Sequence, residues 1–554
     1  MPAKGRTFVR VVKFLLAGVT IFCFSWIASV SEWHTGVRWT NRRGYSERSM
    51  STMRTIVGYS EKKQEEMNRP TTVSCDRLPV FPKIKHFNRT WSHNSDTLTW
   101  QRVAGTHVSL YSAYYDERSP QRYVRILATF PGRNFSSQYT LFCQTRSSNP
   151  HSDSVEVVAA KPLEIWYHTW DLESLKIETP LLLSCPLTET LHGPSVVAVV
   201  MQPCDDPTNA FELIPSKNYK AKRMFTICVK DMEFHKDISQ NLIEWLEINK
   251  MLGVDMIDVY VNKVTKATEK VLLHYQDEGY VRLFNVPIKD NSKRTLWQRR
   301  RDHAITYNDC LYRNLEQSEF IVPLDVDEVI LPKIVDTWPE LLIRLQRLGW
   351  NTSHYSSILI KNVFFFDFMQ DVNKYKTIKS QGIKDDTYDK RDDVRIKVSP
   401  NLEIGDIKLV YDSNSNIDTI NNELNEEDEV LHAKYKSRCG RKLPTPKLVS
   451  YVVSSAKISP FGMYSKSWMS TKKVLTAFNH YPLSSIGPVQ SPLGWSSPVK
   501  EVQLNHYKES CNTTVFEECA KYGRRARIDT AALRLSRRLT RAIAHAICIP
   551  INSI

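Results

Sequence analysis

The segment Phe320–Pro332 reads F-I-V-P-L-D-V-D-E-V-I-L-P, an apolar run that leads into three carboxylates. The run 320–322 predicts a short buried strand because its residues are aromatic or β-branched. The acids Asp325, Asp327 and Glu328 would repel one another at the end of such a strand unless a cation neutralised them. The Asp-x-Asp spacing suits a divalent ion with oxygen ligands that also holds a substrate diphosphate. A solvated acidic loop is the ordinary alternative for so short a motif.

Predicted strands and helices alternate before this segment. We expect strands at 225–229, 256–261 and 280–287, and helices at 237–252 and about 295–315. This alternation predicts an α/β fold with a mainly parallel sheet. Ligands of such sheets bind beyond the carboxyl ends of the strands, where Val229, Lys230 and the acids fall. The sequence contains neither G-x-G-x-x-G nor G-x-x-x-x-G-K-[ST], so it has no dinucleotide fingerprint and no P-loop.

The beginning of the chain predicts a membrane anchor. Basic residues precede an uncharged run, Phe14–Val30, whose length is at the lower limit for a bilayer span. The basic flank predicts a cytosolic tail at 1–13, a transmembrane signal anchor at 14–30, a stem at 31–74 and a lumenal C-terminus. A cleaved signal peptide is the alternative.

Composition is consistent with a lumenal protein. Of eleven cysteines, one lies in the apolar run and ten follow it, so they can pair completely in an oxidising compartment. Four N-x-S/T sequons follow the run, at Asn88, Asn134, Asn351 and Asn512. The net charge of +15 is concentrated in the two ends of the chain, and no nucleic-acid module appears, so we expect no nucleic-acid partner.

Residues 75–216 predict a β-rich, sandwich-like module. Short strand-like pieces alternate there with Pro, Gly, Asn and Ser. Trp166, Tyr167 and Trp170 are candidates for stacking on sugar. Aromatic side chains packed in or against a β core are the alternative.

Several motifs in fixed order resemble glycosyltransferase family 92. They are F-T-I-C-V-K-D-M from Phe225, E-W-L-E-I-N-K-M-L-G-V from Glu244, V-Y-V-N from Val259, Y-N-D-C-L from Tyr307, P-L-D-V-D-E-V-I-L-P from Pro323, S-K-S-W-M-S-T-K-K-V from Ser465 with His480, and N-H-Y-K from Asn505. The resemblance covers roughly 222–508. It implies a GT-A nucleotide-sugar-binding domain, a single-pass type II Golgi membrane protein and an inverting mechanism. Characterised animal members of the family transfer galactose from UDP-galactose to glycans in β linkage, including β1,4 to the core fucose of N-glycans.

The chain departs from the family pattern at three places. Residues 230–233 read K-D-M-E where many members have small and aromatic residues, residues 414–429 form an acidic insertion, and Lys508 stands where Arg is usual. We therefore predict a catalytic domain at 222–510, followed by a basic tail at 511–554, with the donor sugar and acceptor less defined than the fold.

The resemblance assigns roles to individual residues. Asp325, Asp327 and His506 are the predicted metal ligands, and carboxylate, diphosphate and imidazole ligation suits Mn²⁺. Val229, Lys230, Asp325 and Lys508 are predicted to bind the donor. By residue type, Lys508, Lys466 and Arg301 are candidates to neutralise phosphate, with a solvated surface role as the alternative for each.

Inversion also requires a base for the acceptor hydroxyl proton. Asp367, in V-F-F-F-D-F, has the apolar setting that raises the pKa of a carboxyl group. Asp371 and Glu328 are rival candidates. Glu244 lies on a predicted helix, where it either supports the sheet or contacts substrate.

The tail and the overall activity each allow two interpretations. Eight Lys and Arg residues lie between Lys521 and Arg541, beside apolar residues at helical spacing. A helix packed on the catalytic domain and a helix bound to acidic glycans or membrane are the alternatives. For the whole chain, the alternative to a metal-dependent galactosyltransferase is a non-catalytic lumenal carbohydrate-binding protein on a GT-A scaffold.

Overall fold

The computed structural model describes residues 70–84, 90–91, 100–147, 154–167, 177–189, 191, 193–213, 222–289, 294–370, 446–511 and 519–547, with single helical residues at 433 and 436 and two strands at 393–396 and 407–410. Residues 70–554 form one compact unit. The predicted cytosolic tail, the anchor and most of the stem lie outside the described residues. Within the ranges just given, no helix combines the length and apolarity that a membrane span requires.

Two antiparallel sheets form the β-rich part. One has the order β1-β2-β3-β7-β6 and the other the order β5-β4-β8-β9. Their strands are β1 (Gln101–Arg102), β2 (Ser109–Asp116), β3 (Tyr123–Pro131), β4 (Phe142–Ser147), β5 (Val155–Ala159), β6 (Lys161–Glu164), β7 (Glu178–Pro186), β8 (Pro194–Val200) and β9 (Phe211–Glu212), with the short helix η1 (Phe135–Ser137) after β3. The disulfide Cys143–Cys185 joins the two sheets, and Cys75–Cys204 joins the start of the described chain to the loop after β8.

A seven-stranded sheet forms the centre of the larger part. Its order is β12 (Val281–Asn285), β11 (Met256–Lys263), β10 (Arg223–Glu233), β13 (Ser318–Pro323), β20 (Lys466–Ser470), β15 (Ser357–Ile360) and β23 (Trp495–Ser496). The first four strands are parallel, as predicted. The sheet as a whole is mixed, because β20 enters it antiparallel to both β13 and β15.

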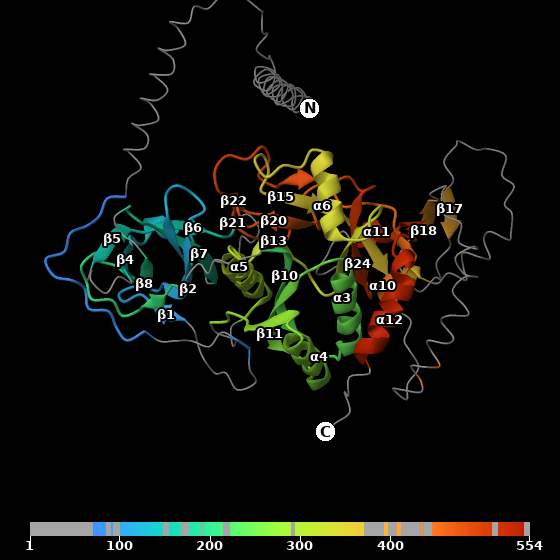
Figure 1. Cartoon of the computed structure of the whole chain (residues 1–554), viewed down its shortest axis with the longest axis horizontal. Helices are drawn as coiled ribbons and strands as arrows, with labels where there is room; N and C mark the ends of the chain where they lie inside the picture. Colours follow the sequence, from blue (N-terminus) through green and yellow to red (C-terminus); the bar gives the residue numbers. More distant parts are fainter. Residues whose placement is uncertain are drawn as a thin grey trace, which may run out of the picture. The chain divides into compact units, whose positions relative to one another are not determined.

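Helices pack on this sheet and on the elements around it. They are α3 (Ser239–Met251), α4 (Lys266–Asp277), α5 (Leu296–Arg313), α6 (Trp338–Arg347), α10 (Lys447–Ser450), α11 (Cys519–Gly523) and α12 (Ser536–Ile547), with short helices η4 (Asp367–Met369) and η5 (Leu533–Leu535). The start of α6 is fixed by a capping box, in which Thr337 and Glu340 satisfy each other's backbone N–H groups. Within the basic tail, Leu535, Leu539 and Ile543 are buried in the core that α3 shares, and Figure 1 shows α12 beside α3. The apolar stripe of the tail is therefore packed on the unit that contains the central sheet.

Helix α5 lies between the central sheet and the β-rich part. Along β7, Leu181 and Leu183 face the core between the two antiparallel sheets, whereas Leu182 faces the core that contains α5. This alternation follows from the two-residue period of a strand. Asp309 of α5 accepts hydrogen bonds from the hydroxyls of Tyr114 on β2 and Tyr260 on β11. The disulfide Cys228–Cys310 also ties α5 to β10.

Three smaller sheets complete the fold. The order β14-β24-β16 consists of β14 (Glu328–Pro332), β24 (Val502–Lys508) and β16 (Asn362–Phe366). The other two sheets are β17 (Asp393–Ile396), β18 (Ile407–Val410), β25 (Arg525–Ile528) and β19 (Val453–Ser455), and the pair β21 (Val474–Thr476) and β22 (Ser484–Ser485). A disulfide joins Cys511 and Cys519. The remaining cysteines beyond the anchor, Cys439 and Cys548, lie outside the described residues.

Candidate active site

The three carboxylates of the opening segment occupy a tight turn between β13 and β14. The backbone N–H of Glu328 donates to the carbonyl of Asp325 at 3.0 Å, and the N–H of Asp325 donates to Glu328 Oε2, also at 3.0 Å. Strand β13 is parallel to β10, so the turn lies at the same edge of the sheet as Lys230. Val229 is the last residue of the regular pairing between β10 and β11 before a bulge. The structure thus brings together the ends of two strands, as the sequence predicted.

His506 reaches this turn from β24. It is paired in register with Glu328, and its Nε2 lies 3.3 Å from Asp327 Oδ2 and its Nδ1 3.4 Å from Glu328 Oε1. Its ring stacks on Phe364 of β16 with centroids 5.2 Å apart. Both ring nitrogens are buried, and neither makes a hydrogen bond of good geometry with any described residue. Each nitrogen nevertheless lies within 3.4 Å of a carboxylate oxygen, which makes this imidazole a candidate ligand for an ion bound between it and the carboxylates.

Three lysines surround the carboxylates. Lys230 pairs with Asp325, and the buried Lys466 lies 3.2 Å from Asp325 Oδ2 and 3.1 Å from Glu328 Oε2. Lys508 lies 3.4 Å from Asp327 Oδ2. Burial alone would raise the pKa of Asp325, but Lys230 and Lys466 outweigh it and hold that pKa well below its usual range. The site therefore presents ionised carboxylates and ammonium groups side by side.

Asp327 differs from its neighbours in exposure. Its side chain is 41 % exposed, whereas that of Glu328 is 3 % exposed. Desolvation would raise the pKa of Asp327, but His506 and then Lys508 lower it below the usual range. No cluster of three or more His, Cys, Asp or Glu side chains forms a ready-made metal site among the residues with described positions. Asp327 and His506 are instead a two-residue donor pair that fits an ion whose other ligands come from elsewhere.

A second charged network, next to Lys230, was missed by the sequence reasoning. Asp231 is buried with a φ of 31°, and it accepts from Arg294 Nη2 at 2.9 Å, Arg299 Nε at 2.5 Å and His303 Nε2 at 3.1 Å. A left-handed backbone is uncommon for a non-glycine residue, and such strain concentrates at functional sites. The spacing of Arg299 and His303 by four residues, on one face of a helix, was the sequence signal available.

Burial sets the protonation of this network. It raises the pKa of Asp302, which binds Arg294 at 2.8 Å, to about 6. It also lowers the pKa of His303 to about 4, so His303 is neutral at pH 7 and its Nε2–H donates a hydrogen bond to Asp231. The pKa of Asp231 lies below its usual range because His303, Arg294 and Arg299 outweigh the cost of its burial. Two arginines are thus held rigidly beside the end of β10.

Asp367, the predicted base, does not have the apolar setting expected from its sequence, because its side chain is 38 % exposed and paired with a lysine. Its Oδ1 is 2.9 Å from Lys447 Nζ, and it also interacts with the hydroxyl of Tyr451. The segment that carries these partners packs on Tyr507, whose side chain alternates with His506 along β24. Among the described contacts, none joins Asp367 to Asp325, Asp327 or His506. Its role as a base remains a prediction.

Glu244 has a structural position on α3. Its carboxylate accepts from the backbone N–H of Leu448, at the start of the segment that holds Lys447. Burial raises the pKa of Glu244 to about 7, although the N–H groups of Leu448 and Lys447 oppose the shift. Of the rival bases, Glu328 is occupied by Lys466, and Asp371 lies outside the described residues.

Arg301 and the predicted sugar-stacking aromatics lie at the β-rich part. Arg301 is buried, donates to Thr179 Oγ1 at 2.8 Å and stacks over the ring of Trp166 at 5.3 Å. Trp166 is 4 % exposed and also contacts the edge of Phe478, so it is a packed aromatic. Tyr167 is 48 % exposed, and Trp170 lies outside the described residues.

Comparisons with known proteins identify the family of the chain. A family model described as "Glycosyltransferase family 92" matches residues 223–536, more than half of the chain. A glycosyltransferase family 92 protein of Caenorhabditis elegans is 27% identical over 135 residues, which are 23% of this chain and 26% of that protein. The beta-1,4-galactosyltransferase galt-1 of the same species is 23% identical over 245 residues, 41% of this chain and 52% of that protein. The chain thus matches about a quarter and about half of the lengths of these relatives.

A solved ferredoxin-NADP+ reductase from Plasmodium falciparum is 12% identical, with coverage of 39% of this chain and 83% of that one. Its TM-score of 0.10 is too low to bear on the fold.

Proposed function

The chain belongs to glycosyltransferase family 92, and we propose that it is an inverting, Mn²⁺-dependent galactosyltransferase that moves galactose from UDP-galactose to a glycan acceptor in β linkage. The observation that carries this proposal is the convergence of Asp327, His506 and three lysines at the carboxyl edge of parallel strands. Ligands of α/β sheets bind at this edge. The name of the galactosyltransferase relative supports galactose as the sugar.

The donor would bind with its diphosphate among the lysines, in a central sheet that we propose to be a GT-A nucleotide-sugar-binding domain. Lys230 and Lys508 are partly exposed and sit on either side of the carboxylates, so both are accessible to an incoming phosphate. Lys466 is buried between Asp325 and Glu328, and together with Lys230 it holds the pKa of Asp325 well below its usual range. The backbone of Val229 and the arginines on Asp231 flank the same strand end, where they would orient the nucleotide.

Asp327 and His506 would hold the divalent ion, with Asp325 as a further predicted ligand. A bound Mn²⁺ supplies charge neutralisation for a departing diphosphate, an effect of several kcal/mol. The unsatisfied nitrogens of His506 and the exposed carboxylate of Asp327 fit this group. Asp325 is held by two lysines in the chain alone, so its ligation would require Lys230 or Lys466 to shift toward phosphate.

Transfer with inversion is a single displacement. The acceptor oxygen bonds to C1 of galactose while the bond from C1 to the diphosphate oxygen breaks, and UDP leaves. The hydroxyl proton of the acceptor passes to a base, for which Asp367 is our candidate. The acceptor would be a glycan on a glycoprotein, with the fucose of an N-glycan core as the proposed example.

We further propose that the protein is a single-pass type II membrane protein of the Golgi. The four disulfides among the described residues support an oxidising compartment, since cytosolic thiols stay reduced. The predicted anchor at 14–30 would place the catalytic unit in the lumen.

One assay tests the function. Purified protein is incubated with UDP-galactose, Mn²⁺ and an array of N-glycan acceptors, and UDP release and product mass are measured. We expect acceptor-dependent UDP release that Asp327→Asn reduces by roughly a thousandfold, because the ion's several kcal/mol convert at 1.4 kcal/mol per tenfold. Asp336→Asn is the control, since this half-exposed residue pairs with Arg534 beyond the far end of β14. Glycan binding without UDP release from any UDP-sugar would instead support the non-catalytic carbohydrate-binding protein.

A further inference from the structure

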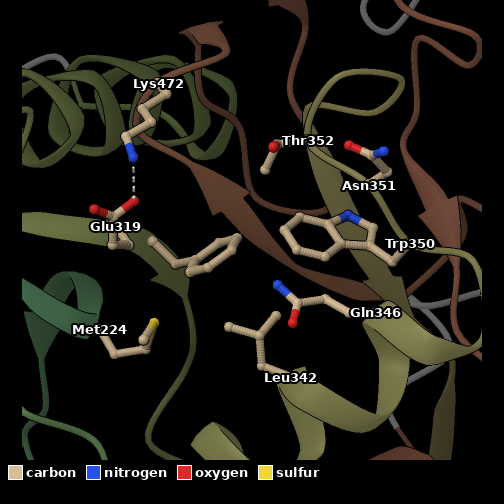
Figure 2. Close-up of a pocket in the computed structure, with 9 residues that line it drawn as sticks. Met224, Glu319, Leu342, Gln346, Trp350, Asn351, Thr352 and Lys472 are labelled. Atoms are coloured by element: carbon tan, nitrogen blue, oxygen red, sulfur yellow. Dashed lines mark ion pairs between the residues drawn. The ribbon is translucent and has the colours of Figure 1, made fainter.

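A pocket of about 580 Å³ lies at the opposite end of the central strands from the acid cluster. Met224 is the second residue of β10 and Phe320 the third of β13, so both belong to the amino ends of these strands. Figure 2 shows the indole of Trp350 facing the pocket, with Gln346 and Asn351 on either side of it. The volume is in the range of pockets that hold small ligands. Its apolar floor with a few polar side chains is the usual composition of such sites.

Asn351 on the rim of this pocket is the acceptor residue of a sequon. The segment Asn351-Thr352-Ser353 is N-T-S, and Asn351 and Ser353 are exposed. Asn351 Oδ1 accepts the backbone N–H of Ser353 at 2.8 Å, and its own carbonyl accepts the N–H groups of His354 and Tyr355. The bond to Oδ1 orients the side chain, while Nδ2, the atom that becomes glycosylated, makes no contact among those described.

We propose that Asn351 carries an N-linked glycan whose first N-acetylglucosamine residue occupies this pocket. The sugar has an apolar ring face that matches Trp350 and Met224, and an acetamido group and hydroxyls that match the amide of Gln346. The ion pair between Lys472 and Glu319, 3.0 Å apart, closes the far side of the pocket and offers further partners for hydroxyls. Because the sugar is attached at the rim, its local concentration is high and modest contacts suffice to hold it.

This site would serve stability rather than catalysis. Trp350 and Phe320 contact each other with ring centroids 5.5 Å apart, and both belong to the central core. Each of these two side chains is only 4 % exposed, so the sugar would shield the end of a core that is already packed rather than bury much new apolar surface. The proposal rests on the lumenal location given above, and its test separates the two.

Asn134 provides a matched control. It begins the sequon N-F-S on an exposed turn between β3 and η1, where its φ is 58°. A glycan there shares the lumenal environment of Asn351 but is not attached at the rim of this pocket. Ser136→Ala and Ser353→Ala remove the two sequons without changing either asparagine or any residue that lines the pocket.

The experiment uses full-length protein expressed in an animal secretory pathway. Peptide mapping by mass spectrometry measures glycan occupancy, and a peptide-N-glycosidase is applied before and after denaturation. We expect both asparagines to be occupied and the glycan at Asn134 to be released from native protein. Release at Asn351 should be slower by about tenfold or more, equivalent to ~1.4 kcal/mol, until the protein is denatured. Ser353→Ala should also lower the melting temperature more than Ser136→Ala does.

A pocket-filling variant shows whether protection arises from the pocket. Gln346 is exposed and lines the pocket, so Gln346→Trp should fill it without disturbing the core. We expect this variant to remain glycosylated at Asn351 and to lose the protection. The pocket proposal alone would be overturned if the glycans at Asn134 and Asn351 were released at equal rates, or if the glycan at Asn351 stayed protected in Gln346→Trp. Absence of glycan from both asparagines would overturn the lumenal location with it.

Discussion

Replacement of Lys466 by methionine tests whether the buried charges of the site depend on one another. Lys466 is fully buried, and its Nζ lies 3.2 Å from Asp325 and 3.1 Å from Glu328. Lys466→Met keeps the length and apolar stem of the side chain but leaves two carboxylates without their shared cation. Loss of one partner from a buried ion pair costs about 3–5 kcal/mol. We expect the free energy of unfolding at pH 7 to fall by that amount in urea denaturation of the donor-free protein.

The matched control lies six residues further along the chain. Lys472 pairs with Glu319 at 3.0 Å, but its side chain is 60 % exposed, so Lys472→Met should change stability by about 0–1 kcal/mol. The pH dependence gives a second test. Lys466 keeps the pKa of Asp325 low in the native protein, so the stabilisation is present above the ordinary Asp pKa and is lost as pH falls.

In Lys466→Met the carboxylates can relieve their burial by taking up protons. The deficit of the variant should therefore shrink as pH falls from 7 toward about 4, where unfolded Asp and Glu titrate. If Lys466→Met is as stable as Lys472→Met at pH 7, or if its deficit does not change with pH, the charges at the turn are not coupled through this lysine.

Three further predictions use other parts of the structure. His506→Ala should lower kcat/KM less than Asp327→Asn does, because water can replace one ligand of several, and Mn²⁺ titration of turnover distinguishes the two variants. Burial raises the pKa of Glu244 to about 7, so the wild-type protein loses part of its stability as pH rises from about 4.5 through 7. In thermal melts, Glu244→Gln should therefore be more stable than wild type by roughly 1–3 kcal/mol at pH 8 and equally stable at pH 4.5. A Glu244→Gln protein that is less stable than wild type at both pH values would contradict this explanation. Tyr114→Phe removes a buried hydroxyl that donates to the carboxylate of Asp309 and should cost about 1.5–3 kcal/mol, more than the partly buried Tyr115→Phe, as measured by urea denaturation.

Local sequence patterns predicted the elements whose core contacts are periodic. The expected helices at 237–252 and 295–315 correspond to α3 and α5, and the strand at 320–322 lies within β13. Helix α4 was missed because its apolar residues are few, although Thr265 caps it. Helix α6 was missed too, although Thr337 and Glu340 give the sequence signature of a capping box.

Long-range pairing explains what the sequence could not predict. Strand β20 joins β13 from far along the chain, and no local pattern indicates that it runs antiparallel or that Lys466 enters the acid cluster. The approach of His506 to Asp327 was expected from family resemblance alone, and its geometric cause is the register of β24 on β14. The left-handed backbone at Asp231 and its arginine partners depend on tertiary contacts, which sequence spacing does not encode.

The position of α5 between two sheets also sets an order of events during protein synthesis. Strand β7 ends at Pro186 and α5 begins at Leu296, so the ribosome must add the whole intervening stretch, which takes roughly 5–20 s, before the helix exists. During that delay α5 does not yet cover the face of the first sheet that carries Tyr111, Leu127 and Leu182. Apolar surface exposed in this way promotes aggregation and chaperone binding. The bond Cys143–Cys185 can close early, whereas Cys228–Cys310 must wait for the helix. The bond Cys228–Cys310 therefore forms only after the chain contains the helix that covers the first sheet.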